Sequence, residues 1–365
     1  MCMAACLKST EPDTSGPTPW EIQPAATVDD GTTYWPAAQW RTALPGQVGM
    51  DADALATLSR DVRRQRWPGM RSLLIVHGGY LVFNEYVGGA TPQQLQPLHS
   101  MTATVTGLLV GMAVREDKLH TTDGIVQLFP EYSGIISPLK SGIGVDHLLC
   151  MRSGISIDEE IFGGAAPTSL SRDWLDLIFS RPILASPGEE WHYNSADAVV
   201  LGGALRATTG QAANDYARQK LFAPLGITDY TWFTGPPNGL PQMGSGLSLT
   251  SPDMARLGYL LLRNGQWQGT QLVTPAWVAS MGERKSAAAV RWLQYSLDFG
   301  RMLWVLPPIP GGPGDAVAGT GIRGQWIIVV PGRDLVVVAT GDAETVDEHA
   351  ETLRLLYDVI VPAVR

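Results

Sequence analysis

Apolar and polar residues follow regular periods along most of the chain after about residue 50. Asp51 precedes Leu55, Leu58 and Val62, whose i, i+3, i+7 spacing predicts a helix capped by the aspartate. Two β-rich runs then flank Gly78-Gly79, a dipeptide typical of a two-residue hairpin turn. The folded body is therefore predicted to start with a helix and a hairpin.

A strongly apolar helix is predicted to begin at Ser100. Val105, Leu108 and Met112 recur on one of its faces, and the charged stretch 115–118 closes it. The segment that follows is a mainly helical region in this prediction. Its clearest helical patterns lie at 198–208, 214–221 and 252–263.

Strand patterns return near the end of the chain. FGRMLWV, QWIIVVP and DLVVVATG predict three strands, and residues 347–359 predict a closing helix. Strands near both ends enclose a helical insertion, so we predict an α+β fold with one sheet built from both ends of the chain. The predicted organisation is an α/β sheet domain from residues 49–117 and 286–365, and a helical region over 118–285.

Residues 1–48 form a different kind of segment, in which prolines with many Thr, Gly and Ala favour an extended leader wrapped on the body. Ala4 and Ala5 before Cys6, followed by a polar, Pro-rich tether, resemble the end of a bacterial lipoprotein signal, but the apolar stretch that should precede them is absent. If the true start lies upstream, we expect a lipid anchor at Cys6 and an extracytoplasmic location, periplasmic or membrane-anchored. Otherwise we expect a cytoplasmic protein.

Composition and charge exclude several classes of function. Hydrophobic residues make up 45% of the chain and charged residues 17%, which excludes extensive disorder. The net charge is −9 and no basic stripe is present, so nucleic acid is not an expected partner. No apolar stretch reaches the ~20 residues that span a bilayer. Nothing in the sequence predicts an obligate protein partner.

Motifs for metals and cofactors are missing or stand in the wrong context. Cys2, Cys6 and Cys150 lack CxxC spacing, and the histidines lack the H-x-H or H-x-x-x-H spacing of a metal site. GTGIRG, at 319–324, satisfies G-x-G-x-x-G, but a β-rich run follows where a dinucleotide fingerprint needs a helix. No G-x-S-x-G nucleophile elbow occurs. We therefore expect no metal and no cofactor.

Ser100 is the strongest candidate for chemistry. A serine at a helix N-terminus is most often only an N-cap. The same position also presents backbone N–H groups and the positive end of the helix dipole to a developing negative charge, which suits a nucleophile. Position alone leaves both interpretations open.

Three motifs resemble those of the serine β-lactamase and penicillin-binding-protein superfamily, in its class C β-lactamase-like esterase and amidase branch. HSMTATVTGLLVGMA resembles the S-x-x-K helix, with Ser100 as its serine. Tyr193-Asn194-Ser195 resembles the second motif, and Gly319-Thr320-Gly321 stands where the third has Lys-Thr-Gly or another triplet. The motifs keep the family's order between about residues 50 and 360. Their Y-x-S and G-I-x-G-Q forms are similar to those of 6-aminohexanoate-dimer hydrolases and related carboxylesterases.

The resemblance implies a β-lactamase/transpeptidase-like fold, in which a mostly antiparallel sheet flanked by helices meets a mainly helical region at the site. It implies that Ser100 attacks a carbonyl carbon to form an acyl-enzyme, and that Tyr193 relays protons. The N–H groups of Ser100 and Ile322 would bind the oxyanion. The residues implied to bind substrate are Asn194, Ser195, Thr320, Gly321, Arg323 and Gln325.

Ala103 departs from the family pattern. It occupies the position of the lysine one helical turn after the serine, and alanine neither accepts a proton nor lowers the pKa of a nearby tyrosine. With a pKa near the reference value of about 10, Tyr193 would be ionised in about one molecule per thousand at pH 7, a handicap of roughly 4 kcal/mol. We therefore expect strongly impaired acylation. Two explanations are open: deliberate replacement of the lysine, which the otherwise intact motifs favour, and natural loss of the base.

The predicted function is that of a cofactor-free serine hydrolase acting on a small-molecule ester or amide. A β-lactamase or D,D-peptidase is the closer alternative. Gly319 disfavours it by removing the usual lysine partner of a substrate carboxylate, unless Arg323 replaces that lysine. A non-catalytic ligand-binding protein is the alternative from another class. Some tryptophans are expected to line the cleft, among Trp174, Trp191, Trp232, Trp292, Trp304 and Trp326.

Overall fold

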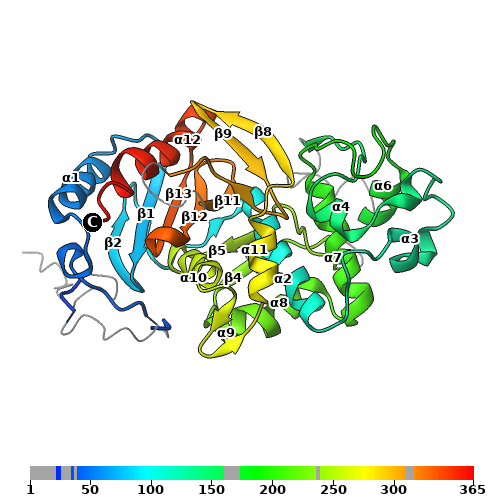
Figure 1. Cartoon of the computed structure of the whole chain (residues 1–365), viewed down its shortest axis with the longest axis horizontal. Helices are drawn as coiled ribbons and strands as arrows, with labels where there is room; N and C mark the ends of the chain where they lie inside the picture. Colours follow the sequence, from blue (N-terminus) through cyan, green and yellow to red (C-terminus); the bar gives the residue numbers. More distant parts are fainter. Residues whose placement is uncertain (1–21, 26–33, 37–38, 160–172, 236–238, 310–315) are drawn as a thin grey trace, which may run out of the picture.

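The computed structural model describes residues 22–25, 34–36, 39–159, 173–235, 239–309 and 316–365. A large sheet lies beside a mainly helical region (Figure 1). The strands are β1 (Met70–His77), β2 (Tyr80–Tyr86), β3 (Gln96–Pro97), β4 (Tyr230–Trp232), β5 (Leu247–Leu249), β6 (Gln266–Trp267), β7 (Thr270–Gln271), β8 (Ser286–Trp292), β9 (Tyr295–Phe299), β10 (Trp304–Val305), β11 (Val317–Gly321), β12 (Gln325–Val330) and β13 (Leu335–Gly341). The helices are α1 (Ala52–Arg63), α2 (Thr102–Arg115), α3 (Ile125–Leu128), α4 (Val145–Leu149), α6 (Trp174–Ser180), α7 (Ser195–Thr209), α8 (Ala213–Ala217), α9 (Ala223–Leu225), α10 (Ser251–Leu262), α11 (Pro275–Met281) and α12 (Val346–Leu355).

The large sheet joins the two ends of the chain. Its eight strands run in the order β2-β1-β13-β12-β11-β10-β9-β8, and all neighbours pair antiparallel. β1 pairs directly with β13, with Leu73 opposite Ala339. The predicted hairpin is confirmed: Gly78 and Gly79 both have positive φ, as a tight turn between β1 and β2 requires.

Helices cover the sheet on both faces. Trp326 and Ile327 are neighbours in β12 and so point to opposite faces. The Trp326 Nε1–H donates to the carbonyl of His349 in α12 (2.9 Å). Ile327 instead faces Gly258 of α10, where a Cβ would come within 2.9 Å of it. α12 and α10 therefore lie on opposite faces, which explains why every residue of β12 and β13 is buried.

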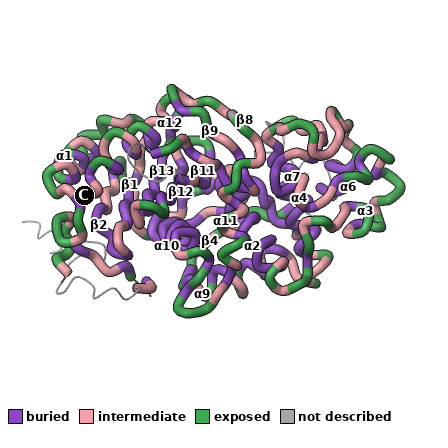
Figure 2. Tube along the Cα trace, viewed as in Figure 1, coloured by how far each residue is buried: buried purple, intermediate pink, exposed green. Residues whose placement is uncertain are grey.

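The central helix α2 connects the sheet with the helical region. All its residues from Thr102 to Ala113 are buried, and it packs against α7, α11 and β11. Figure 2 shows the buried residues concentrated in the sheet and in the helices beside it. A helix that is apolar on all sides belongs to a protein core, so the turn just before α2 is fixed by both parts of the molecule.

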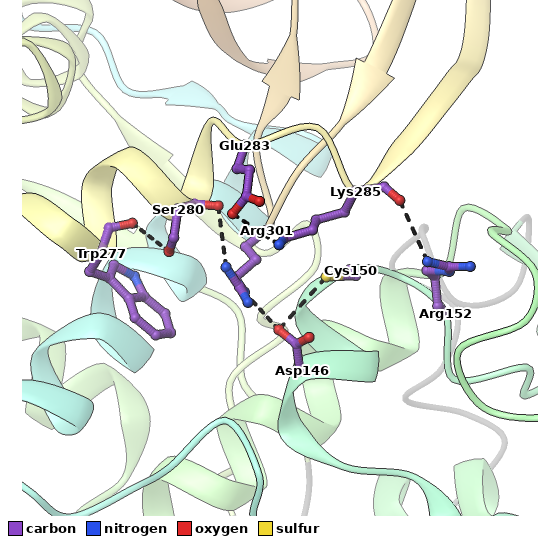
Figure 3. Close-up of polar contacts among 8 residues, drawn as sticks. All are labelled: Asp146, Cys150, Arg152, Trp277, Ser280, Glu283, Lys285 and Arg301. Atoms are coloured by element: carbon purple, nitrogen blue, oxygen red, sulfur yellow. Dashed lines mark hydrogen bonds and ion pairs between the residues drawn. The ribbon is translucent and has the colours of Figure 1, made fainter.

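A polar seam ties the helical region to the far end of the sheet (Figure 3). Asp146 of α4 pairs with Arg301, which follows β9, at 2.6 Å between Oδ1 and Nε. Arg152 reaches the carbonyl of Lys285, just before β8, with its Nη1 (3.5 Å). These contacts hold the β8–β9 hairpin against the helical region.

Part of the sheet differs from the prediction. Phe299 already ends β9, and Met302 has φ +54°, so only Trp304–Val305 of the predicted strand 299–305 forms a separate strand. The β8–β9 hairpin was not predicted, because the alanine-rich sequence of β8 carries little β-propensity. The other predicted strands and the capped helix α1 are confirmed.

The described part of the leader lies on the body. Trp40 is buried, and its Nε1–H donates to the carbonyl of Pro252 at the start of α10 (3.2 Å). Its ring lies 5.6 Å from that of Tyr259. Cys6, the expected anchor, falls outside the described residues. None of the described helices is long and apolar enough to cross a membrane.

Candidate active site

Ser100 lies in a tight turn between β3 and the central helix. The 3-10 turn His99–Met101 runs directly into α2, and no side chain caps it, so Ser100 is not the N-cap that its sequence position suggested. His99 has φ +49°, in the left-handed region that residues other than glycine rarely adopt. Backbone strain of this kind is held by the surrounding structure and recurs at functional sites.

Tyr193 is the polar partner of Ser100. The Ser100 hydroxyl lies near enough to Tyr193 to affect the pKa of the tyrosine. The tyrosine ring is stacked on Trp304, with centroids 6.3 Å apart and planes 7° from parallel. Burial raises the pKa of Tyr193 above its ordinary value, the nearby Ser100 hydroxyl opposes the shift, and the charge of Glu159 adds to it. The tyrosine is therefore a neutral phenol at pH 7 and is harder to ionise than its reference pKa suggests.

Carboxyl groups, but no lysine, lie behind Tyr193. Ala103 is buried one helical turn after Ser100. The N–H of Ser195, the first residue of α7, donates to Glu159 Oε1 (2.7 Å), whereas the buried Ser195 Oγ has no hydrogen-bond partner among the described residues. Burial raises the pKa of Glu159 and of the fully buried Asp197. Among the described residues, no lysine or arginine joins this group.

β11 passes the Ser100 turn at contact distance. Gly321 faces this turn, where a Cβ would overlap the carbonyl oxygen of Leu98 and lie 3.0 Å from the Cβ of His99. Glycine is needed here because the two backbones touch. A turn at 322–324, with φ +69° at Arg323 and +90° at Gly324, then leads into β12. The GTGIRG stretch is thus a β-hairpin, which confirms that it is no dinucleotide fingerprint.

Neighbouring side chains of β11 point alternately toward and away from the Ser100 turn. Gly319 faces α2, where a Cβ would come within 2.8 Å of Thr104 Oγ1. Thr320 points the other way. Its hydroxyl donates to the carbonyl of Gln325 (3.0 Å) and lies 3.2 Å from Nε2 of His349. The polar group of Thr320 is therefore engaged within the protein.

A pocket of about 720 Å³ lies over Ser100 and Tyr193. Its walls are mainly apolar, and Arg323 and Glu344 are the charged side chains among the described lining residues. The side chains of Ile322 and Val346 are 60% and 59% exposed. The remaining lining residues are Trp191, Ala289, Val290, Trp292, Trp304, Thr320, Gly321, Ala343, Thr345 and His349. The described residues contain no group of three His, Cys, Asp or Glu side chains placed to hold a metal ion.

The Beta-lactamase family matches residues 25–358 of the chain. The chain belongs to the beta-lactamase family. The 6-aminohexanoate-dimer hydrolase of Paenarthrobacter ureafaciens is 25% identical over 339 residues, which cover 87% of this chain and 85% of that protein. The resemblance inferred from the three motifs is thereby confirmed.

Solved structures share the beta-lactamase fold with this chain. The octameric penicillin-binding protein homologue from Pyrococcus abyssi superposes with a TM-score of 0.65 at 20% identity, over 84% of this chain and 78% of that one. EstCE1, described as a hydrolase with promiscuous acyltransferase activity, gives a TM-score of 0.69 at 18% identity, over 83% and 97% of the two chains. The predicted α+β, transpeptidase-like fold is confirmed.

The fold brings some of the predicted site residues together and places others beneath them. Ser100, Tyr193, Thr320, Gly321, Ile322 and Arg323 share the pocket, as do Trp191, Trp292 and Trp304. Asn194 caps α7 and donates to the carbonyl of Ile155 (2.9 Å), and Gln325 donates to the carbonyl of Gly341 (2.7 Å). Those outside the described lining are Ala103, Asn194, Ser195, Gln325, Trp174, Trp232 and Trp326.

Several residues at the site were not predicted. Glu159 and His349 reach it from segments far from the three motifs in sequence, and the β8 wall of Ala289 and Val290 belongs to the unpredicted hairpin. A histidine in an amphipathic helix or a glutamate in a loop carries no signal by itself. Only the tertiary fold identifies them.

Proposed function

We propose that this beta-lactamase family member is a cofactor-free serine hydrolase that cleaves a small ester or amide through an acyl-Ser100 intermediate. The observation that carries this proposal is that Ser100 and Tyr193 line the same mainly apolar pocket, with the Ser100 hydroxyl near enough to affect the pKa of Tyr193. A nucleophile and a proton-relaying group in contact are what acyl transfer requires. The name of the Paenarthrobacter relative, a hydrolase, agrees with this chemistry.

In the proposed reaction, Ser100 Oγ attacks the carbonyl carbon while its proton passes to the oxygen of Tyr193 in its phenolate form, the minor form at pH 7. The carbonyl oxygen becomes an oxyanion that accepts hydrogen bonds from the N–H groups of Ser100 and Ile322. As the carbonyl re-forms, the bond to the leaving alcohol or amine breaks, the leaving group takes the proton back from Tyr193, and an ester remains on Ser100. Water then attacks this ester, loses a proton to the same relay and releases the acid and free Ser100.

Tyr193 is poorly suited to accept a proton in this site. A tyrosine accepts a proton well only as a phenolate, and burial raises the pKa of Tyr193. A lysine at position 103 would favour the phenolate by its charge, but alanine stands there. We infer that this chain acylates slowly and that a lysine at this position increases the rate.

The pocket favours neutral substrates with apolar groups. Three tryptophans line the pocket. Gly319 stands at the position of the third-motif lysine, which would bind a substrate carboxylate, and Thr104 occupies the space next to it. The hydroxyl of Thr320 is engaged by His349 and Gln325. Arg323 remains as the cation of the lining. These features favour an esterase or amidase over a β-lactamase or D,D-peptidase.

Ala103 itself favours a second candidate, a non-catalytic ligand-binding protein. Turnover of short-chain p-nitrophenyl esters by the parent chain, by Ala103→Lys and by Ala103→Lys combined with Ser100→Ala separates the two. The hydrolase proposal expects the lysine to raise the rate by at least about a hundredfold and Ser100→Ala to abolish the gain. If the lysine variant stays as inactive as the serine-free control on esters, amides and β-lactams, the ligand-binding candidate replaces it.

A further inference from the structure

His349 lies on the side of β11 opposite to Ser100. It belongs to α12 and is only 6% exposed. Its imidazole is stacked on Trp326, with centroids 4.8 Å apart, and meets Trp292 edge-on at 5.0 Å. Two aromatic rings from β12 and β8 thus fix the plane of the imidazole against the outer side of the third-motif strand.

The hydrogen bonds of His349 define its tautomer. The N–H of Gly324 donates to Nδ1 (3.1 Å), so Nδ1 carries no proton. In the neutral ring the proton is then on Nε2, which donates to Thr320 Oγ1 (3.2 Å). Thr320 in turn donates to the carbonyl of Gln325 (3.0 Å). Burial lowers the pKa of His349 to about 4, which keeps the ring in this neutral form at pH 7.

Both bonds of the imidazole end on the same turn of the backbone. Thr320 precedes residues 322–324 and Gly324 closes them, so His349 links the two strand ends across the turn. The residue between, Arg323, has φ +69° and its carbonyl accepts from the N–H of Ala343 (3.0 Å). This turn carries the Ile322 N–H that is assigned to the oxyanion. A left-handed, non-glycine turn keeps its shape only where its surroundings hold it.

We propose that His349 is a positioning residue for the oxyanion-binding turn: its two ring nitrogens hold Thr320 and Gly324, and so fix the direction of the Ile322 N–H at the substrate carbonyl. The inference rests on the proposed hydrolase function. It gives Thr320 a role inside the protein in place of substrate binding. Oxyanion donors act by being oriented before the charge develops, so a loosened turn lowers kcat while leaving apolar substrate binding unchanged.

Three variants at position 349 separate the hydrogen bonds from packing. His349→Phe keeps an aromatic ring but removes both bonds. His349→Asn keeps an acceptor near Nδ1 for the Gly324 N–H, and His349→Gln keeps a donor near Nε2 for Thr320. Thr352→Val, a buried change one turn further along α12, controls for general damage to the helix. Each is made in the parent chain and in Ala103→Lys.

Two measurements are made on each variant: kcat and KM for a p-nitrophenyl ester, and hydrogen exchange of the Ile322 and Gly324 amides by NMR. We expect His349→Phe to lower kcat roughly tenfold or more with KM within about twofold, and to speed exchange of the Gly324 amide at least tenfold. His349→Asn should restore slow exchange of the Gly324 amide, and His349→Asn and His349→Gln should each recover part of kcat, because each keeps one of the two bonds. Thr352→Val should change neither.

Three results would each overturn the positioning role. The first is an equal loss of kcat in His349→Phe and His349→Asn, and the second is a rise in KM without a fall in kcat. The third is unchanged amide exchange of the turn in His349→Phe. If no form of the chain, including Ala103→Lys, hydrolyses any substrate, the hydrolase function fails and the positioning role fails with it. Faster Gly324 exchange in His349→Phe would then report only a structural contact.

Discussion

Tyr193 lies in the same pocket as Ser100, near enough for the serine hydroxyl to affect its pKa, although no lysine stands one helical turn after the serine. Tyr193 is also stacked on Trp304, so its hydroxyl is held in place without help from a cation. Packing thus positions the tyrosine, whereas none of the described residues supplies a positive charge beside it.

Removing the Tyr193 hydroxyl should remove most of the activity. In the Ala103→Lys chain, we expect Tyr193→Phe to lower kcat/KM by about 10² or more, because the ring still stacks on Trp304 but no longer relays a proton. Tyr295→Phe is the matched control, since Tyr295 is another stacked tyrosine, buried against Tyr357 and away from the pocket. The rate of ester hydrolysis by the two variants tests this prediction, and full activity in Tyr193→Phe would contradict the role assigned to the tyrosine.

A side chain at position 321 should separate β11 from the Ser100 turn. Gly321→Ala places a Cβ against the Leu98 carbonyl, so we expect a loss of about 1–3 kcal/mol in unfolding free energy and a strong loss of turnover. Gly134→Ala, where a Cβ meets nothing within 4 Å, is the control. Urea unfolding and ester hydrolysis test both effects. An unchanged midpoint for Gly321→Ala would show that the backbones are not in contact.

Stability should fall in acid because of His349. Its pKa is lowered to about 4 by burial among neutral groups, Trp292, Trp326, Thr320 and Gly324, whereas the unfolded chain binds a proton near pH 6.5. Above that pH the histidine contributes no pH dependence. Between about pH 6.5 and 4 the unfolded state binds a proton that the folded state does not bind, which lowers the free energy of unfolding by on the order of 3 kcal/mol in total.

Urea unfolding between pH 7 and pH 4 measures this effect. The free energy of unfolding of the parent chain should decline more steeply with falling pH than that of His349→Asn, which has no proton to bind at this position. Parallel curves for the two proteins would mean that His349 titrates normally in the folded state.

Trp292 should limit the length of the acyl group. It stands in the pocket wall between Trp304, at 5.6 Å, and His349, at 5.0 Å. Trp292→Ala enlarges the apolar space, so we expect the preference among p-nitrophenyl esters to shift by roughly tenfold toward longer chains. Trp232→Ala, outside the described lining, should leave the chain-length profile unchanged. Identical profiles in both variants would remove Trp292 from the binding surface.

Much of the fold was visible in the sequence where apolar patterns are strong. β12 and β13 are buried on both faces and consist almost entirely of β-branched and other apolar residues, and α1 has both its cap at Asp51 and a clear apolar stripe. β8 was missed because alanines in Ser286–Trp292 form a strand only by pairing with β9 and carry no strand signal alone. Pairing is a tertiary property.

The candidate site was predictable only in part. Residue types and order indicated Ser100, Tyr193 and the glycine-rich third motif through their resemblance to a family, but not the contacts among them. His349 and Thr320 are 29 residues apart, and the direction of the Thr320 hydroxyl depends on which face of β11 meets α12. No local pattern encodes that choice. Likewise, the Ser195–Glu159 bond joins two segments 36 residues apart.

The pairing of β1 with β13 sets the order in which this protein becomes functional during its synthesis. His77 leaves the ribosome long before Leu335, its partner in the central pair of strands. Contacts that join distant parts of a chain form late and cost the most loop entropy. The Ser100 turn and Tyr193 are therefore made before the β11–β12 turn. The nascent chain holds Ser100 without the strand that faces it until β11 has been made.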